Sequence, residues 1–370
     1  MIADLRMRKR LDLPLLLLTY LIAALGVLIV FSASYGQQGG FANKQVVWIV
    51  AGTAGLVGAA LFDFHNYARF LKPLYLLNLL SLIAVRSGHF HSSVNGAARW
   101  IAIGPFQYQP SEIAKVVVIL TLAVFLAKNA ATIKTPLTLT TSLLLVAAPA
   151  ALITTQPDLG TGLVVIAIWF AMVFVAGAEP RHLFALFGAA AVLFAGLWVT
   201  GVWPKPFQRQ RLLIFLGLRE DAKKTGYHIA QARIAIGSGG LFGKGYLKST
   251  QVQGGWVPER QTDFIFSDIG EEFGFAGCLA VICLYGILIW RGVRIVVSAD
   301  EDATGKLIAT GVVAMLAFHV IENIGMNVGV MPVAGVPLVL ISYGGSSMIV
   351  TLFSIGLLES IALHRHQLTF

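Results

Sequence analysis

The sequence predicts an all-α integral membrane protein with about ten transmembrane helices. Hydrophobic residues make up 57% of the 370 residues, whereas charged residues make up only 12%. Because a soluble globular domain carries roughly 25% charged residues, this composition excludes that class. Apolar runs of spanning length take up most of the chain, so we expect residues 1–370 to form a single polytopic membrane domain.

The expected helices follow the apolar runs in order. These runs cover residues 13–33, 46–62, 70–86, 112–128, 138–154, 160–177, 182–201, 264–290, 306–329 and 338–363. The first run follows the basic segment RMRKR and resembles a signal peptide. At about twenty apolar residues it is too long for a typical cleaved signal peptide, so we interpret it as a signal anchor.

The distribution of Lys and Arg predicts the orientation of the chain. An even number of spans places both termini on one side, and the short segments on that side hold most of the Lys and Arg residues outside the long loop. The short loops on the other side and their margins hold only Lys44, Arg86 and Arg99. The positive-inside rule therefore predicts cytoplasmic termini, which places the long loop at 202–263 on the outer side.

The loop at 202–263, between the seventh and eighth expected helices, is the longest polar segment of the chain. Its basic residues outnumber its acidic residues, and it ends at Asp263. The stretches RQRLLIFLGL and IAQARIAIG mix apolar and basic residues at helical spacing, so we expect short amphipathic helices there. We expect this basic extracytoplasmic loop to carry much of the functional site.

A glycine-rich stretch, GSGGLFGKG, occupies 237–245 within this loop. It does not fit the phosphate-binding P-loop, because Ser238 and Gly245 stand where that motif requires Gly and then Ser or Thr. Two interpretations stay open: the backbone amides of the turn bind an anion, or the stretch is a tight surface bend.

Several charged residues border or interrupt the apolar runs. Glu112 and Lys115 are three residues apart, so we expect them to pair on one helix face. A lysine at this depth either snorkels to the interface or, as we favour, faces a polar cavity. Asp158 suits the N-cap of a helix. Glu322, inside the ninth run, marks a functional interior or a helix–helix hydrogen bond.

Three more carboxylates, those of Asp268, Glu271 and Glu272, lie near the start of the eighth expected helix. With Asp263 just before that helix, we expect them to form an acidic wall that faces the basic loop.

Five segments carry a resemblance to a known family. They are NGAARWIAIGPFQYQPSEIAK, QPDLGT, GYHIAQARIAIGSGGLFGKGY, PERQTDFIF with the following GEEFGF, and NIGMNVGVMPVAGVPLVLISYGGSS. In this order, and over nearly the whole chain, they resemble the signatures of the SEDS family (shape, elongation, division and sporulation). The short amino-terminal tail, the STQ before WVPER, and NIGMNVGVMPV resemble the elongation members of that family more than the division members.

This resemblance implies a peptidoglycan glycosyltransferase that polymerises lipid II for cell elongation at the outer face of the bacterial cytoplasmic membrane. The implied partners are a class B penicillin-binding protein, which supplies transpeptidation, and other membrane proteins of the elongation complex; no nucleic acid is expected. The essential aspartate of the family falls on Asp263, and the Glu and Lys of its PSE-x-A-K segment fall on Glu112 and Lys115. The arginine of its QRQR segment falls on Arg211.

The implied reaction sets chemical demands on the site. A departing lipid pyrophosphate needs cations in a water-poor environment. The candidates are Arg99, Lys115, Arg211 and Lys244, and we prefer Arg211 and Lys115. A carboxylate that takes the proton of the attacking sugar hydroxyl acts as general base, and we assign this role to Asp263. With one base and a direct displacement, the α-linked donor gives a β-linked product by inversion.

Three alternatives stay open. In the first, Asp263 holds a divalent cation, Mg²⁺ or Mn²⁺, together with Glu271 and Glu272. In the second, the chain is a flippase for the lipid-linked precursor, and Lys115 and Glu322 line a polar translocation path. In the third, the chain is a structural scaffold for a transpeptidase, which would leave Asp263 and Lys115 without a role.

Overall fold

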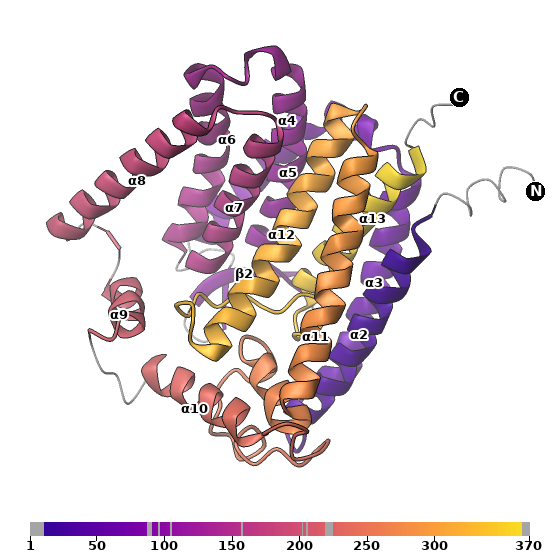
Figure 1. The fold of residues 1–370 in the computed structure, drawn as a ribbon, viewed down its shortest axis with the longest axis vertical. Coiled ribbons are helices and arrows are strands. Elements are labelled where there is room, and N and C mark those ends of the chain that lie inside the picture. The colour runs from indigo at the N-terminus through magenta and orange to yellow at the C-terminus, as the bar shows by residue number, and fades with distance from the viewer. Residues whose placement is uncertain are drawn as a thin grey trace, which may run out of the picture.

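The computed structural model describes residues 11–86, 91–94, 97–103, 106–156, 158–201, 203–204, 206–218 and 225–364. Figure 1 shows these residues as a bundle of long helices. The apolar helices are α2 (Leu13–Ala33), α3 (Phe41–Leu61), α4 (Leu71–Arg86), α5 (Pro110–Lys128), α6 (Pro136–Thr155), α7 (Leu159–Val175), α8 (Pro180–Thr200), α11 (Ile265–Ser298), α12 (Ala303–Val328) and α13 (Gly345–His364).

The prediction of an all-α membrane protein is confirmed. Among the described residues, eight helices are long and apolar enough to cross a membrane, while α4 and α7 are shorter apolar helices. Each expected span overlaps one of these helices. Hydropathy finds them because a helix in lipid satisfies its backbone internally and needs only an apolar exterior.

The largest difference from the prediction lies before α13. The helix expected at 338–363 begins only at Gly345, and residues 329–344 form an irregular segment that we call the α12–α13 loop. Pro337 has no amide hydrogen to donate to a helix, and Gly335 has a φ of +73°, which a residue with a Cβ rarely adopts. Most apolar side chains of this loop are buried, so burial within the protein explains its high hydropathy.

Smaller elements lie between the long helices. They are the 3₁₀ helices η1 (Phe64–Arg69) and η2 (Ala130–Thr132), the strands β1 (His91–Val94), β2 (Ala97–Ile103) and β3 (Phe106–Tyr108), and the helices α9 (Pro206–Phe215) and α10 (Thr225–Ser238). The strands form an antiparallel sheet in the order β1-β2-β3, which the sequence pattern does not indicate. Helix α10 contains the second amphipathic stretch, and α9 overlaps the first but ends at Phe215, so the expectation of helices there is confirmed.

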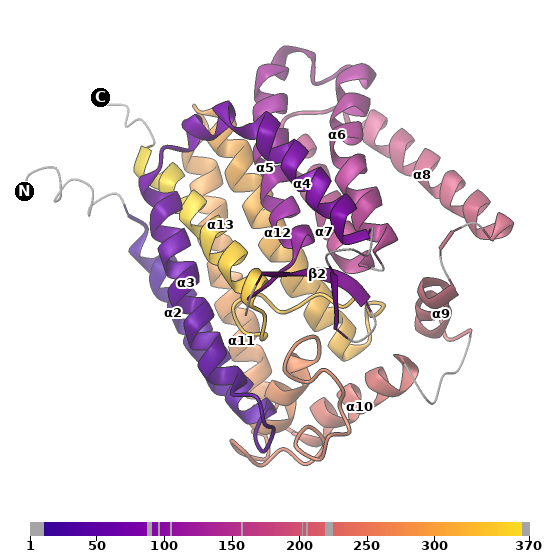
Figure 2. The same ribbon diagram turned by 180° about the vertical axis from the view of Figure 1, so that it is seen from behind.

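Helices α3 and α13, far apart in the sequence, pack side by side, as Figure 2 shows from behind. Glycines allow the close approach. A Cβ added at Gly356 would lie 2.4 Å from the carbonyl oxygen of Leu56, and one at Gly52 would lie 2.5 Å from Cδ1 of Leu352. Small residues at such crossings let two membrane helices gain van der Waals contact along their backbones.

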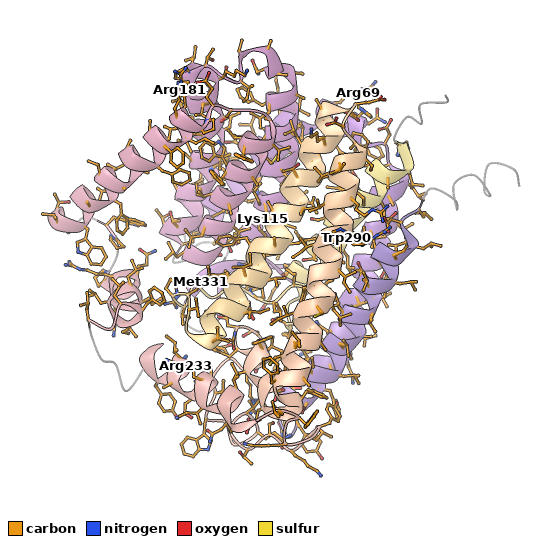
Figure 3. All side chains as sticks on the ribbon, in the orientation of Figure 1. Arg69, Lys115, Arg181, Arg233, Trp290 and Met331 are labelled. Carbon is orange, nitrogen blue, oxygen red and sulfur yellow. The ribbon has the colours of Figure 1, made fainter. Side chains whose placement is uncertain are left out.

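The two ends of the bundle carry different elements. Arg69 and Arg181 lie at one end, Arg233 of α10 lies at the other, and Lys115 lies between them (Figure 3). The start of α2 and the end of α13 lie toward the end that carries Arg69 (Figure 1). This arrangement agrees with an even number of spans and separates the α9–α10 region from the described chain ends.

Candidate functional site

Asp263 is held through its backbone at the start of α11. Its carbonyl oxygen accepts hydrogen bonds from the side-chain amides of Asn323 (2.9 Å) and Asn327 (3.0 Å), both on α12. Residues four apart share one face of a helix, so a single face of α12 fixes the carbonyl group of Asp263. The side chain of Asp263 is only half-buried, and its Oδ2 lies against Gly335, where an added Cβ would be 3.3 Å away.

The α12–α13 loop borders the same segment. Ser342 donates from its hydroxyl to the carbonyl oxygen of Thr262 (2.6 Å), and the amide of Tyr343 donates to the carbonyl oxygen of Gln261 (2.9 Å). A stretch that hydropathy assigns to a membrane helix therefore forms a wall of the site around Asp263.

Lys115 is enclosed in a buried cluster between α5 and α12. Its Nζ lies 2.9 Å from each carboxylate oxygen of Glu112 and 2.9 Å from Nε2 of His319. The other ring nitrogen of His319, Nδ1, lies 3.2 Å from the carbonyl oxygen of Pro337. Because a carbonyl oxygen only accepts, Nδ1 carries the proton and Nε2 accepts from the lysine.

This geometry excludes one of the two interpretations of Lys115. Its side chain is 1% exposed and that of Glu112 is 4% exposed, so the lysine does not snorkel. The expected pairing of Glu112 with Lys115 is confirmed. Through His319, the pair also contacts the α12–α13 loop at Pro337.

Asp158 joins the start of α7 to the start of α5. Its Oδ1 accepts from the amide of Thr161 (3.2 Å), which confirms the expected N-cap. Its Oδ2 accepts from the hydroxyl of Ser111 (3.2 Å) and from the side-chain amide of Gln109 (3.3 Å). Asp158 therefore helps to position the helix that carries Glu112.

The glycine-rich turn packs directly on the backbone of α11. The helix has a non-helical φ of +66° at Gly274, and this break frees carbonyl groups in the preceding turn. The amides of Lys244 and Gly245 donate to the carbonyl oxygens of Glu271 and Glu272, each at 3.0 Å. These amides are therefore not available to an anion, and the structure supports the interpretation as a tight bend.

Lys244 and Glu271 form an ion pair beside this turn. Lys244 Nζ lies 2.5 Å from Glu271 Oε1. The Glu271 carboxylate also accepts from the amides of Thr250 (2.8 Å), Gln251 (2.9 Å) and Val252 (3.1 Å). Of the expected acidic wall, Glu271 faces the basic loop through Lys244, and Glu271 anchors residues 250–252.

The remaining predicted cations lie on separate elements. Arg211, on α9, donates from Nη1 to the carbonyl oxygen of Val333 in the α12–α13 loop (3.0 Å). Arg99 belongs to β2, but its side chain lies outside the described residues. The structure thus gathers Asp263, Arg211 and, through His319, Lys115 around the α12–α13 loop, whereas Lys244 pairs with Glu271 at the glycine-rich turn.

Sequence reasoning overlooked His319 and Asn327 and gave Asn323 no role. All three side chains are almost fully buried. They recur every four residues and so line one face of α12. Such a polar row inside an apolar run is the signal that could have identified them, because polar groups in lipid need partners within the protein.

The expected divalent cation has no preformed cluster in the described part of the chain. There, no three His, Cys, Asp or Glu side chains come together as metal ligands. Glu271 already accepts from Lys244 and from backbone amides. A cation held by Asp263 with Glu271 and Glu272 stays a prediction.

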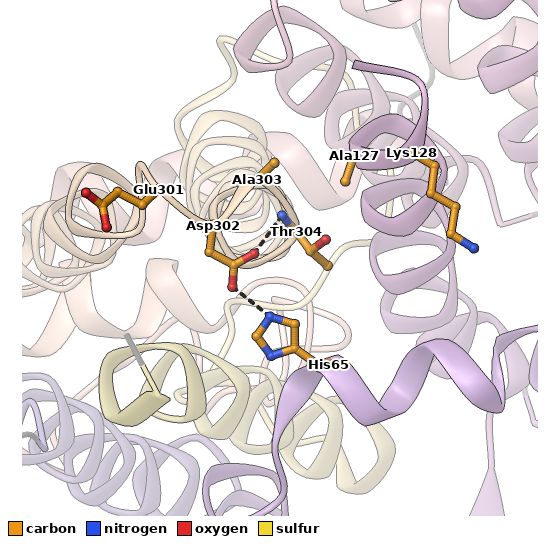
Figure 4. Close-up of a pocket in the computed structure, with 7 residues that line it drawn as sticks. All are labelled: His65, Ala127, Lys128, Glu301, Asp302, Ala303 and Thr304. Atoms are coloured by element: carbon orange, nitrogen blue, oxygen red, sulfur yellow. Dashed lines mark hydrogen bonds and ion pairs between the residues drawn. The ribbon is translucent and has the colours of Figure 1, made fainter. Parts of the chain in front are cut away.

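A separate polar pocket lies where η1 meets the start of α12 (Figure 4). Nδ1 of His65 lies 2.8 Å from Asp63, and Nε2 lies 3.0 Å from Asp302. Asp302 also caps α12 by accepting from the amide of Thr304 (3.0 Å). Burial alone would raise the pKa of Asp63, but hydrogen bonds from His65 lower it below its ordinary value. These contacts tie η1 to α12, which is a structural role.

The sequence of this chain is similar to a known family and to relatives of similar length. The model of the FtsW, RodA and SpoVE family, described as cell cycle proteins, matches residues 12–367. The peptidoglycan glycosyltransferase MrdB of Escherichia coli K12 is 38% identical over 368 residues, which cover 98% of this chain and 96% of MrdB.

Two solved structures share the fold. One, of a peptidoglycan synthase complex that coordinates polymerization and crosslinking, has a TM-score of 0.80 at 32% identity, covering 95% of this chain and 97% of its own. The other is the crystal structure of the rod shape determining protein RodA of Thermus thermophilus. Its TM-score is 0.69 at 30% identity, covering 96% of this chain and 98% of its own.

Proposed function

This chain belongs to the family of FtsW, RodA and SpoVE cell cycle proteins, and from that premise we propose that it polymerises lipid II with Asp263 as general base. It is a peptidoglycan glycosyltransferase. The likeness to MrdB and to a rod shape determining protein supports a role in cell elongation.

The observation that carries the proposal is the placement of Asp263. Its backbone is fixed by two buried amides of α12, while its carboxylate stays half-buried beside Gly335. A catalytic group needs this combination, because a rigid support sets the direction of the carboxylate and partial exposure lets a substrate reach it.

In the proposed step, a hydroxyl of the acceptor sugar attacks the anomeric carbon of the donor. The hydroxyl proton passes to the carboxylate of Asp263 as the new glycosidic bond forms. The bond between the anomeric carbon and the pyrophosphate oxygen breaks, and the lipid pyrophosphate leaves with the electron pair. Attack opposite the leaving group inverts the anomeric configuration.

The charge that develops on the pyrophosphate needs positive groups in a water-poor site. We assign direct contact with the pyrophosphate to Arg211, with Arg99 as a further candidate. Lys244 already pairs with Glu271 at the glycine-rich turn, so we do not assign it this contact. Lys115 is enclosed by Glu112 and His319, which supports a positioning role. It holds the α12–α13 loop beside Asp263.

The proposed setting is the bacterial cytoplasmic membrane, with both termini in the cytoplasm and α9 and α10 outside. The likeness to a peptidoglycan synthase complex supports a class B penicillin-binding protein as partner. Its transpeptidase would crosslink the strands that this chain polymerises, and other membrane proteins of the elongation complex would join them.

The test is polymerisation of fluorescent lipid II by the purified full-length chain together with its cognate penicillin-binding protein, with products separated by gel electrophoresis. Glycan strands that a muramidase digests are the expected result. Absence of polymer, with lipid II crossing the bilayer of liposomes that contain the chain, would overturn the proposal in favour of a flippase.

A further inference from the structure

A second group of carboxylates lies on the first half of α11. Asp268 and Glu272 are four residues apart, so they share one helix face, and both are 0% exposed. Neither oxygen of Asp268, nor Oε2 of Glu272, has a hydrogen-bond partner among the described residues. Oε1 of Glu272 accepts from the amide of Leu247 (3.0 Å) and from the hydroxyl of Ser32.

A buried hydroxyl from another element lies beside these carboxylates. Ser249, in the segment after the glycine-rich turn, is 3% exposed. Its hydroxyl lies beside both Asp268 and Glu272, yet it forms no well-aligned hydrogen bond to either. Buried oxygen atoms of two elements thus lie close together, and the Ser249 hydroxyl, both Asp268 oxygens and Oε2 of Glu272 lack a well-aligned partner.

The neighbouring cations do not neutralise this group. Lys244 is committed to Glu271. Arg260 lies near enough to attract Asp268 electrostatically, but its guanidinium donates to the carbonyl oxygen of Val252 and makes no ion pair with Asp268 among the described residues. Two buried carboxylates without a paired cation are costly, because taking a charge out of water is strongly unfavourable.

We propose that Asp268, Glu272 and Ser249 form a binding site for a divalent cation. The donors are all oxygen atoms, which hard cations such as Ca²⁺, Mg²⁺ and Mn²⁺ prefer. Both oxygens of Asp268 and Oε2 of Glu272 bind the ion, and the hydroxyl of Ser249 completes the protein ligands. The cation balances the two negative charges.

Such an ion would join three parts of the fold. Asp268 and Glu272 belong to α11, Ser249 belongs to the loop that follows the glycine-rich turn, and Ser32 of α2 contacts Glu272. The site therefore fastens the loop that carries Lys244 to the helix that begins after Asp263. This inference goes beyond the proposed reaction and does not depend on it.

The experiment uses the full-length chain in detergent, stripped with EDTA, and Mn²⁺ as the probe. Electron paramagnetic resonance should detect one tightly bound Mn²⁺ per chain, and the melting temperature should rise as Mn²⁺ binds. Asp268→Asn should weaken Mn²⁺ binding by about 100-fold or more, since even changes around the ligands of a metal cost about 10- to 100-fold. Ser249→Ala should weaken it less.

The matched control is Asp300→Asn, since Asp300 has a 75% exposed side chain in the turn before α12. It should bind Mn²⁺ like the wild type, and so should Asp263→Asn. If Asp263→Asn loses the ion while Asp268→Asn keeps it, the ion belongs to the catalytic carboxylate and the proposal is wrong. A stripped chain that binds no Mn²⁺, and whose melting temperature follows only pH, would show that a proton occupies the site instead.

Discussion

The side-chain amide of Asn323 donates to the carbonyl oxygen of Asp263 at 2.9 Å and to that of Val336 at 2.8 Å. One buried side chain of α12 therefore ties the start of α11 to the α12–α13 loop. Because these two segments flank the proposed base, the precision of the site depends on a residue that has no chemical role in the reaction.

Replacing Asn323 by alanine should reduce polymerisation more than stability. The change removes the Asn323 donor from the carbonyl group of Val336 and leaves that of Asp263 with Asn327, and a buried polar group without a partner costs about 1–3 kcal/mol. Loss of the fixed geometry should lower the polymerisation rate by at least about tenfold, because small misplacements of catalytic groups have large effects. Rates and melting temperatures measured on the same preparation check this.

Ile321→Ala is the control for Asn323→Ala, because Ile321 is on the same helix and is 55% exposed. It should leave the polymerisation rate unchanged. Equal losses of rate in the two variants would mean that Asn323 does not position Asp263.

The buried ion pair of Glu112 and Lys115 should behave as a unit. Glu112→Gln leaves the Lys115 ammonium without its counter-charge, which should cost about 3–5 kcal/mol of stability. The double variant Glu112→Gln/Lys115→Met should recover most of this loss, because it removes the buried charge altogether. Apparent melting temperatures of the single and double variants give the comparison.

If the pair also positions the α12–α13 loop through His319, the double variant should stay impaired in polymerisation despite its recovered stability. A double variant that regains both stability and full activity would restrict this pair to a purely structural role.

The crossing of α3 and α13 should not tolerate a single added methyl group. Gly356→Ala would place a Cβ 2.4 Å from the carbonyl oxygen of Leu56, and overpacking of this kind costs about 1–3 kcal/mol. Gly58→Ala, on α3, is the control, since its Cβ would meet nothing within 4 Å. Thermal unfolding should show a lower melting temperature only for Gly356→Ala; an unchanged value for that variant would contradict the close packing.

Much of the fold could be predicted from local patterns. Each apolar run overlaps a helix, because a segment in lipid must satisfy its backbone hydrogen bonds internally and a helix does so. Hydropathy detects such segments from composition alone. The pairing of Glu112 with Lys115 was predictable because three residues along a helix bring two side chains together. The N-cap at Asp158 was predictable because a capping side chain accepts from an amide only three residues further along the chain.

Long-range contacts could not be predicted in the same way. His319 reaches Lys115 across 204 positions of sequence, and no local pattern encodes that meeting. Residues 338–344 of the α12–α13 loop fall in an apolar run that predicts a membrane helix, and only the prolines and glycines of the loop distinguish a buried irregular segment from a span. The glycine-rich turn left two interpretations open because the break at Gly274, which supplies its hydrogen-bond acceptors, lies in another element.

The most direct test of the central claim compares lipid II polymerisation by the wild type, Asp263→Asn and the control Asp300→Asn, each purified with the same penicillin-binding protein. Loss of a general base should lower the rate by about 100- to 10,000-fold, while Asp263→Asn keeps the melting temperature and partner binding of the wild type. Asp300→Asn should polymerise normally. Glycan strands formed at the wild-type rate by a folded Asp263→Asn chain would contradict the assignment of Asp263 as the base.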